Sequence, residues 1–293
     1  MKLRTVALTA AIAAVFSLSA CAPAPAPTTT PSASIAVDAA AVALLPADIS
    51  KSGELVWAVD ASYAPNEFKD TDGTPIGWDV ELAAAISQKL GLKATFVQAG
   101  FDNIIPSVVA NKYNVGVSSF TDNAERQKKV DFVDYFSAGS QWATAAGKTV
   151  DPDNACGLKV SAMTGSTQAL DELPARSKKC TDAGKPAIEV SQYDDNAQAI
   201  TAASLGKVDA VTADSPVTLY GIEQSKGKLV AAGKTYDTAP YGFVLSKTGG
   251  LQKAIQAALT SLAADGTYLA ILKKWGVDSG AISTFSINGA TAK

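Results

Sequence analysis

The sequence predicts an α/β protein made of two doubly wound lobes, with a ligand cleft between them. The first observation is size, because 293 residues, 47% hydrophobic and 18% charged, can bury the cores of two domains. The second is order: segments of strand composition alternate with segments of helical periodicity, as in parallel βαβ units. The third is repetition, since a second series of this kind begins after Gly147. Ligands of such sheets bind beyond the carboxyl ends of the strands, where two lobes form a cleft.

The first series contains three strands separated by two helices. Its elements are strand Glu54–Asp60, a helix from Asp79 to Leu90, strand Leu92–Val97, a short helix capped by Asp102, and strand Val115–Ser119. Leu82, Ile86 and Leu90 recur every four residues, which predicts an amphipathic helix. Asp79 is the expected N-cap of this helix, and Gly91 is its expected stop.

The second series repeats this pattern, and the chain then returns to the first lobe. The series comprises strand Leu158–Met163, a helix opened by Gly165-Ser166-Thr167, strand Ala187–Val190, helix Asp194–Leu205 and strand Val208–Thr212. The return comprises strand Tyr241–Ser246, a helix with its apolar face between Leu251 and Leu262, and helix Thr267–Trp275. We therefore expect lobe 1 to hold residues 51–144 and 240–293, and lobe 2 to hold residues 145–239.

The N-terminal segment is typical of a bacterial export signal. A short basic region precedes an apolar stretch, Val6–Phe16, that is too short to span a bilayer. The tetrapeptide Leu18–Cys21 resembles a lipobox, so we expect residues 1–20 to be a lipoprotein signal peptide and Cys21 to be lipidated. The alternative is an ordinary signal followed by a coincidental cysteine. The acyl chains alone would hold the protein to a membrane.

A tether is expected after the lipidated cysteine. Residues 21–50 are rich in Ala, Pro, Thr and Ser and contain five of the 13 prolines. Such a composition cannot form a core and favours an extended chain. The tether would hold a folded body away from the membrane surface.

The cysteine count fits an exported protein. With Cys21 acylated, Cys156 and Cys180 remain, and an oxidising compartment favours a disulfide between them. Loop closure would make this bond worth about 3 kcal/mol. The alternative is a pair of independent buried thiols.

Composition excludes several classes of function. The formal net charge is only −3, so the chain has no basic field to attract nucleic acid. It has no histidine, which removes Ser-His-Asp and Cys-His nucleophile pairs and Cys/His zinc sites. We expect no metal and no cofactor, and catalysis would be limited to carboxylate, lysine or tyrosine side chains.

Polar and aromatic side chains gather where predicted strands end or predicted helices begin. Those that we expect to bind a ligand are Asp60, Tyr63, Phe101, Ser119, Thr121, Arg126, Thr167 and Asp214. Arg126 can bind a carboxylate through two parallel hydrogen bonds, and Asp214 can accept from an ammonium group. Tyr63 and Phe101 can cover an aliphatic stem. This set fits a free amino acid, whose two opposite charges each need a partner when a cleft excludes water.

Each of these residues also has a simpler interpretation. Arg126 could lie on a solvated helix face, and Asp214 could merely cap the helix that follows it. Tyr63 and Phe101 could be core residues, and Gly165–Thr167 is a weak signal because Gly and Ser commonly begin helices. Only their joint order along the chain favours the functional interpretation.

Seven short motifs follow one another in the body of the chain. They are Ala58–Pro65, Gly77–Ala83, Phe101–Pro106, Val117–Thr121, Gly165–Gln168, Gly206–Ala210 and Asp265–Tyr268. Their order resembles that of the extracytoplasmic solute-binding proteins of polar amino-acid ABC importers. This family, bacterial solute-binding protein family 3, has the type II periplasmic-binding-protein fold. The resemblance covers about residues 53–277.

The resemblance implies a role for every candidate residue. Arg126 would bind the α-carboxylate of the ligand beside Ser119, Thr121 and Thr167, Asp214 would take the α-ammonium, Tyr63 and Phe101 would be aromatic walls, and Asp60 would reach the ligand side chain. Hinge strands near Trp142–Ala146 and Thr235–Tyr241 would join the lobes. The implied partners are a free amino acid and an ABC transporter permease with its ATPase. We expect a monomeric, extracytoplasmic, lipid-anchored protein that does not bind nucleic acid.

The chain departs from the family pattern at two positions. Asn66 stands where a Phe often follows the Ala-Pro pair, and Trp78 replaces a usual Phe, so the pocket shape cannot be copied from a relative. Which amino acid binds stays open. The alternatives to a transport receptor are a sensory lipoprotein that uses the same cleft and, with Asp60 or Glu67 as the acid, an enzyme on the same fold. We expect a binding protein rather than an enzyme.

Overall fold

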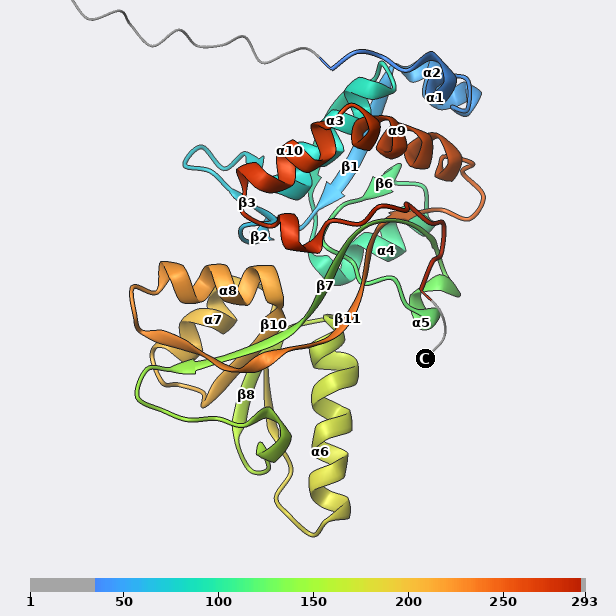
Figure 1. Cartoon of the computed structure of the whole chain (residues 1–293). Helices are drawn as coiled ribbons and strands as arrows, with labels where there is room; N and C mark the ends of the chain where they lie inside the picture. Colours follow the sequence, from blue (N-terminus) through green and yellow to red (C-terminus); the bar gives the residue numbers. More distant parts are fainter. Residues whose placement is uncertain (1–34, 291–293) are drawn as a thin grey trace, which may run out of the picture. The chain divides into compact units, whose positions relative to one another are not determined.

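The computed structural model describes residues 35–290, so the predicted signal peptide and Cys21 lie outside the described residues. An eight-stranded sheet with the order β5-β1-β6-β11-β7-β10-β8-β9 runs through both lobes (Figure 1). Its strands are β1 (Glu54–Val59), β5 (Lys93–Gln98), β6 (Val115–Gly116), β7 (Asp131–Ala145), β8 (Lys159–Met163), β9 (Glu189–Tyr193), β10 (Ala210–Asp214) and β11 (Leu229–Leu245).

Lobe 1 is built around the parallel strands β1, β5 and β6. Its helices are α3 (Trp78–Lys89), α4 (Phe101–Val109), α5 (Ala124–Gln127), α9 (Gln252–Ala264) and α10 (Thr267–Lys274), with a short turn η3 (Asp278–Gly280). Three of these helices, α3, α9 and α10, bury their apolar sides in one core with Trp57 and Phe243 of the sheet. Helix α4 packs in a second core, which contains Phe120 and Phe132. A separate small sheet is formed by β2 (Ser62–Tyr63), β3 (Glu67–Lys69) and β4 (Pro75–Ile76).

Lobe 2 is built around β8, which pairs in parallel with both β9 and β10. Its helices are α6 (Leu173–Asp182), α7 (Asn196–Ser204) and α8 (Ser215–Gln224), with the short turns η1 (Pro152–Asn154) and η2 (Gln168–Glu172). The core on one face of this sheet contains Trp142 and Leu173, and the core on the other contains Ala199 and Val211. The predicted fold class, two α/β lobes with parallel strands in each, is therefore confirmed.

The long strands β7 and β11 carry the chain between the lobes. On the lobe 1 side, β7 pairs with the end of β11, and on the lobe 2 side its residues Ser140–Thr144 pair with β10. Strand β7 therefore crosses from lobe 1 to lobe 2 near Ser137, which pairs with Pro240 of β11. The expected segment Thr235–Tyr241 includes this point, but Trp142–Ala146 lies too late, because Trp142 is already paired with β10 in lobe 2. The expected lobe boundary at residue 144 is late for the same reason.

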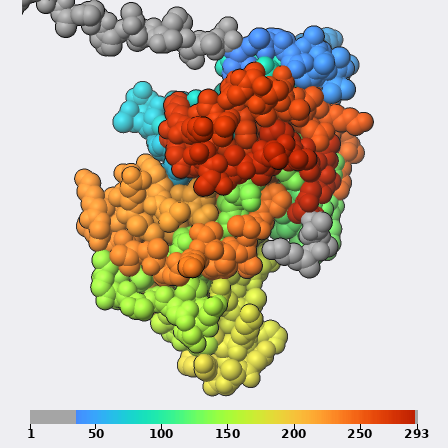
Figure 2. Space-filling view, in the orientation of Figure 1, coloured from blue at the N-terminus to red at the C-terminus, as the bar shows by residue number. Residues whose placement is uncertain are grey.

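The tether prediction is wrong for residues 35–50. These residues form the short helices α1 (Ala39–Val42) and α2 (Ala47–Ser52), which pack on lobe 1 (Figure 2). Asp38 caps α1 by accepting hydrogen bonds from two backbone N–H groups, and Ala41 and Ile49 are buried in the core beside α9. The alanines that suggested an unfolded chain are good helix formers once a polar cap precedes them.

The N-cap of helix α3 lies two residues earlier than predicted, and Asp79 is not that N-cap. The N-cap is Gly77, whose φ of 129° and contact with the backbone of Asn66 leave no room for a Cβ atom. Asp79 is fully buried inside the first turn, and its carboxylate accepts hydrogen bonds from the backbone N–H of Ser119 and the hydroxyl of Tyr135.

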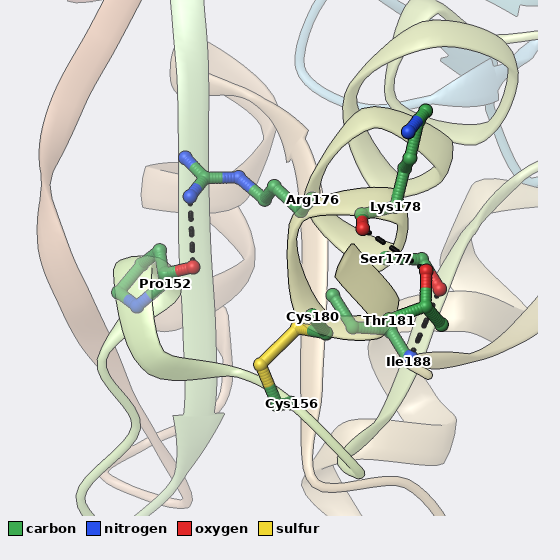
Figure 3. The surroundings of a disulfide bond; sticks show 8 residues. All are labelled: Pro152, Cys156, Arg176, Ser177, Lys178, Cys180, Thr181 and Ile188. Atoms are coloured by element: carbon green, nitrogen blue, oxygen red, sulfur yellow. Dashed lines mark hydrogen bonds between the residues drawn. A yellow bond between two sulfur atoms is a disulfide. The ribbon is translucent and has the colours of Figure 1, made fainter. Parts of the chain in front are cut away.

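The disulfide predicted between Cys156 and Cys180 is present, with a Cα–Cα distance of 5.5 Å. It joins α6 to the segment that precedes β8 (Figure 3). In the part of the chain that the structure describes, no single helix is long and apolar enough to span a membrane. The consecutive helices α9 and α10 reach that length and hydropathy only together, and they are bent by 78°.

The last described residues cross lobe 1, and Gly289 and Ala290 lie beside buried carboxyl groups of that lobe. The backbone N–H of Gly289 donates to Asp134 Oδ2 at 3.1 Å, and that of Ala290 donates to Asp122 Oδ2 at 3.1 Å. Both residues are buried: 3% of the surface of Asp134 and 1% of that of Asp122 are exposed. Burial and the neighbouring Asp122 raise the pKa of Asp134 to about 7.

This pKa predicts a loss of stability as the pH rises. Asp134 titrates near pH 4 in the unfolded chain and near pH 7 in the folded one, so the folded state binds the extra proton between these values. We expect the free energy of unfolding, measured by urea denaturation, to fall between pH 5 and pH 8. Asp134→Asn, which cannot ionise, should reduce that fall by about 1–3 kcal/mol.

Asp131→Asn is the matched control for this experiment. Asp131 is on the same strand and also binds the C-terminal segment through Asn288, but its hydrogen bonds lower its pKa. It therefore titrates below the window, and its replacement should leave the difference between pH 5 and pH 8 unchanged. An equal fall in the wild type and in Asp134→Asn would contradict the raised pKa of Asp134.

Candidate functional site

A small cavity lies between the two lobes. Lobe 1 contributes Tyr63, Phe101, Ser118, Ser119, Thr121 and Arg126, and lobe 2 contributes Met163, Ser166, Thr167, Gln168 and Asp214. Seven of the eight candidate residues from the sequence are among them. The sequence analysis quoted Ser118, Ser166 and Gln168 only as parts of motifs, and it quoted Met163 only as the end of a strand. All four are direct chain neighbours of candidates or end a strand, so strand ends and helix starts were the signals that could have found them.

Arg126 enters the cavity from α5. The side chain of Asn123 caps this short helix by accepting from the backbone N–H of Arg126 at 2.9 Å. Two stacked rings, Phe101 and Phe120, lie under the guanidinium carbon at 5.5 Å and 5.4 Å from their centroids. Burial lowers the pKa of Arg126 to about 10, so the group is still charged at neutral pH. Among residues 35–290, no carboxylate forms an ion pair with it.

The guanidinium of Arg126 is held by backbone carbonyl groups of both lobes. Nη1 donates to the carbonyl oxygen of Thr121 at 2.9 Å, and Nη2 donates to that of Gly165, in lobe 2, at 3.2 Å. These bonds orient the charged plane without neutralising it. The site can therefore attract an anionic group to Arg126.

Asp214 lines the cavity from lobe 2, at the end of β10. Its Oδ1 accepts from the side-chain amide of Gln168 at 2.8 Å, and its Oδ2 accepts from the hydroxyl of Tyr241 at 2.7 Å. The residue precedes α8, but its side chain does not cap that helix. Burial raises the pKa of Asp214. A cationic group in the cavity would oppose this shift, because an ammonium favours the ionised carboxylate.

Tyr63 connects the two lobes directly. Its hydroxyl accepts a hydrogen bond from the backbone N–H of Asp214 at 3.0 Å, while its ring is buried in lobe 1 with Phe101 and Phe120. Together with the bond from Arg126 to Gly165, this contact joins cavity residues of lobe 1 to those of lobe 2. The lobes are thus in a closed arrangement in this structure.

Asp60 is the candidate that does not line the cavity. It is 4% exposed, and its Oδ2 accepts from the backbone N–H of Phe101 at 2.9 Å, at the start of α4. Its Oδ1 accepts from the side chain of Gln98 at 3.4 Å. Burial raises the pKa of Asp60. In this arrangement Asp60 holds the helix that carries the Phe101 wall rather than facing the cavity itself.

The hydroxyl-bearing candidates differ in their surroundings. Thr167 Oγ1 has only a long contact, 3.4 Å, with Gln168 Oε1, and Thr121 contributes its carbonyl group to Arg126. The hydroxyl of Ser119 instead bonds residues behind the cavity, accepting from Asn66 Nδ2 at 2.8 Å. In residues 35–290, no group of three or more acidic or cysteine side chains is placed to hold a metal ion.

Two α/β lobes on a hinge of two strands, closed over a polar cavity, define a two-lobed solute-binding protein. The family model described as bacterial extracellular solute-binding proteins, family 3, matches residues 55–278, and the chain belongs to this family. The predicted family and its type II periplasmic-binding-protein fold are confirmed.

Named relatives are similar over most of the chain. The Arginine-binding protein ArgT of Corynebacterium glutamicum is 36% identical over 248 residues, which are 84% of this chain and 82% of that protein. The solved structure of an ancestral arginine-binding protein bound to arginine has a TM-score of 0.70 at 34% identity, covering 76% of this chain and 98% of that one. An ancestral arginine-binding protein bound to glutamine gives a TM-score of 0.69 at 33% identity, covering 77% and 98%. These relatives are binding proteins, not enzymes.

Proposed function

We propose that this protein binds a free polar amino acid between its lobes and delivers it to the permease and ATPase of an ABC importer. The observation that carries this proposal is the placement of Arg126 and Asp214, from different lobes, in the lining of one cavity. A free amino acid carries a carboxylate and an ammonium, and both lose water when the lobes close. One guanidinium and one carboxylate, supplied by different lobes, match these two charges.

The other cavity residues complete the proposed binding mode. Arg126 holds the α-carboxylate, with the hydroxyl-bearing residues Ser119, Thr121 and Thr167 nearby, and Asp214 accepts from the α-ammonium. The rings of Tyr63 and Phe101 cover the aliphatic stem of the ligand. Because the ligand contacts both lobes, it favours the closed state over the open one, which is the signal that an importer can recognise.

Arginine is the first ligand to test. The relatives named above include an arginine-binding protein and an ancestral structure with arginine bound, while a similar ancestral structure contains glutamine. We propose that Asp60 sets the side-chain end of the pocket through its hold on Phe101. We also propose that the mature chain is monomeric, extracytoplasmic and anchored by lipid on Cys21 after removal of residues 1–20.

Ligand binding is expected to stabilise the protein. The mature chain, with Cys21→Ser to prevent lipidation, would be refolded free of bound ligand and screened by thermal shift and calorimetry against the twenty amino acids. A ligand at a hundred times its dissociation constant should add about 2.7 kcal/mol. One clear hit, recovered unchanged after incubation, supports the proposal. Silence across the panel would contradict it, and conversion of the ligand would indicate an enzyme.

A further inference from the structure

The two residues that depart from the family pattern, Asn66 and Trp78, are bonded to each other. Both are fully buried, and the indole Nε1 of Trp78 donates to Asn66 Oδ1 at 2.7 Å. An indole N–H in a core needs an acceptor, because burying it without one costs about 1–3 kcal/mol. Asn66 supplies that acceptor, so the two side chains form one bonded pair.

The pair reaches the binding cavity through Ser119. The amide Nδ2 of Asn66, fixed in direction by the bond from Trp78, donates to Ser119 Oγ at 2.8 Å. Ser119 lines the cavity, and its backbone has a φ of 51°. A residue with a Cβ atom enters this left-handed region at a cost of roughly 1–2 kcal/mol, so its neighbours must hold it there.

Buried carboxyl groups hold the same serine from another side. Asp79 Oδ2 accepts from the backbone N–H of Ser119 at 3.1 Å, and Glu67 Oε2 lies 3.2 Å from its hydroxyl oxygen. Glu67 Oε1 also contacts the hydroxyl of Ser118, at 3.4 Å. Every one of these groups belongs to lobe 1. They form a polar network directly behind the two consecutive serines of the cavity wall.

The position of Ser119 affects the residues that follow it. Two residues later, the carbonyl group of Thr121 accepts from Arg126 Nη1. Between them, Phe120 stacks on Phe101 at a centroid distance of 4.3 Å and lies under the guanidinium. A change in the backbone at Ser119 would therefore displace the groups that orient Arg126.

We propose that Asn66, fixed by Trp78, is a positioning residue for ligand binding: it holds the Ser119 hydroxyl and thereby the loop 118–122 that orients Arg126. This inference rests on the proposed amino-acid-binding function. It adds to that function a role for two residues that do not line the cavity.

A double-mutant cycle tests the proposal, with L-arginine as the probe or, if the panel above identifies another amino acid, with that one. Asn66→Leu and Ser119→Ala should each lower the affinity about tenfold. The double variant should also lose about tenfold rather than a hundredfold, because both changes remove the same interaction. A product near a hundredfold, or Asn66→Leu within twofold of the wild type, would overturn the proposal.

The chain contains a matched control in the same lobe. Trp57 Nε1 donates to Ser87 Oγ at 2.9 Å, and both residues are fully buried, but the cavity lining does not include them. Ser87→Ala should lower the melting temperature while the affinity stays within twofold of the wild type. If Ser87→Ala weakens binding as much as Asn66→Leu, the effect is a general loss of stability and the proposal fails.

Indole N–H resonances provide a second readout that stability alone does not move. On addition of the amino acid, the Trp78 resonance, assigned with Trp78→Phe, should shift, and that of Trp57 should stay in place. If Asn66→Leu does not fold, the variant Asn66→Leu/Trp78→Phe leaves no buried N–H without an acceptor and carries the same tenfold prediction. A wild type that binds no amino acid would contradict the proposed function, whereas full affinity in these variants would contradict only this inference.

Discussion

Replacing Arg126 by alanine is expected to weaken amino-acid binding at least a hundredfold. The guanidinium has no carboxylate partner among residues 35–290, so its charge is free to pair with the carboxylate of a ligand. Without Arg126, a ligand carboxylate would be buried unpaired, which costs on the order of 3 kcal/mol or more. The substitution also removes the bond from Nη2 to Gly165 that joins the closed lobes.

Two further variants separate these effects. Arg126→Lys keeps the charge but loses the planar pair of donors, so its affinity should lie between those of the wild type and Arg126→Ala. Lys128→Ala removes a cation from the end of the same helix, where it pairs with Glu125 at the surface, and should change affinity less than twofold. Isothermal titration calorimetry measures all three. Affinity retained in Arg126→Ala would exclude the carboxylate role.

The alternation of strands and helices was predictable because each element carries its own local pattern. Helix α3 and its C-cap Leu90 show the apolar repeat Leu82, Ile86 and Leu90, and all three side chains are buried in the core of lobe 1. The exact start of the helix was not predictable. Asp79 is an ideal N-cap by residue type, but the close approach of Gly77 to Asn66 moves the helix start and draws Asp79 into the core.

The hinge strands were the least predictable part of the fold. Strand β11 runs from Leu229 to Leu245, yet only its last third is apolar and buried like an ordinary strand. Its middle pairs with β7 through a series of register shifts between Ala232 and Gly242, so it has no regular alternation for a sequence pattern to reveal. The short helices at residues 39–52 were missed for a related reason, since their stability comes from packing against α9 and β1 of lobe 1.

The site shows the same division between local and long-range information. Arg126 and Asp214 could be proposed from residue type and position at the ends of elements, and the fold brings them to one cavity. The orientation of Asp60 and the link from Trp78 through Asn66 to Ser119 depend on contacts between residues 12 to 53 positions apart. No local pattern specifies such contacts, so only the three-dimensional arrangement reveals them.

Removing the disulfide is expected to lower the free energy of unfolding by about 3 kcal/mol. Cys156 and Cys180 are 24 residues apart in sequence, and cross-linking a loop of that size restricts the unfolded chain by this amount in the loop-closure account. The double variant Cys156→Ala/Cys180→Ala, measured by urea denaturation without reductant, should show the loss. The wild type, denatured in the same urea series with a reductant added, should show a loss of equal size.

Ligand affinity should change little in that double variant, because the disulfide and the cavity lie at opposite ends of the same helical segment. Thr167 and Gln168 precede α6, while Cys180 lies in its last turn. Between them, Arg176 Nη1 donates to the carbonyl of Pro152 at 2.8 Å, a bond that does not depend on the disulfide (Figure 3). A stability loss below about 1 kcal/mol would contradict the loop-closure account. An affinity loss above tenfold would show instead that the disulfide supports the start of this segment, where Gln168 holds Asp214.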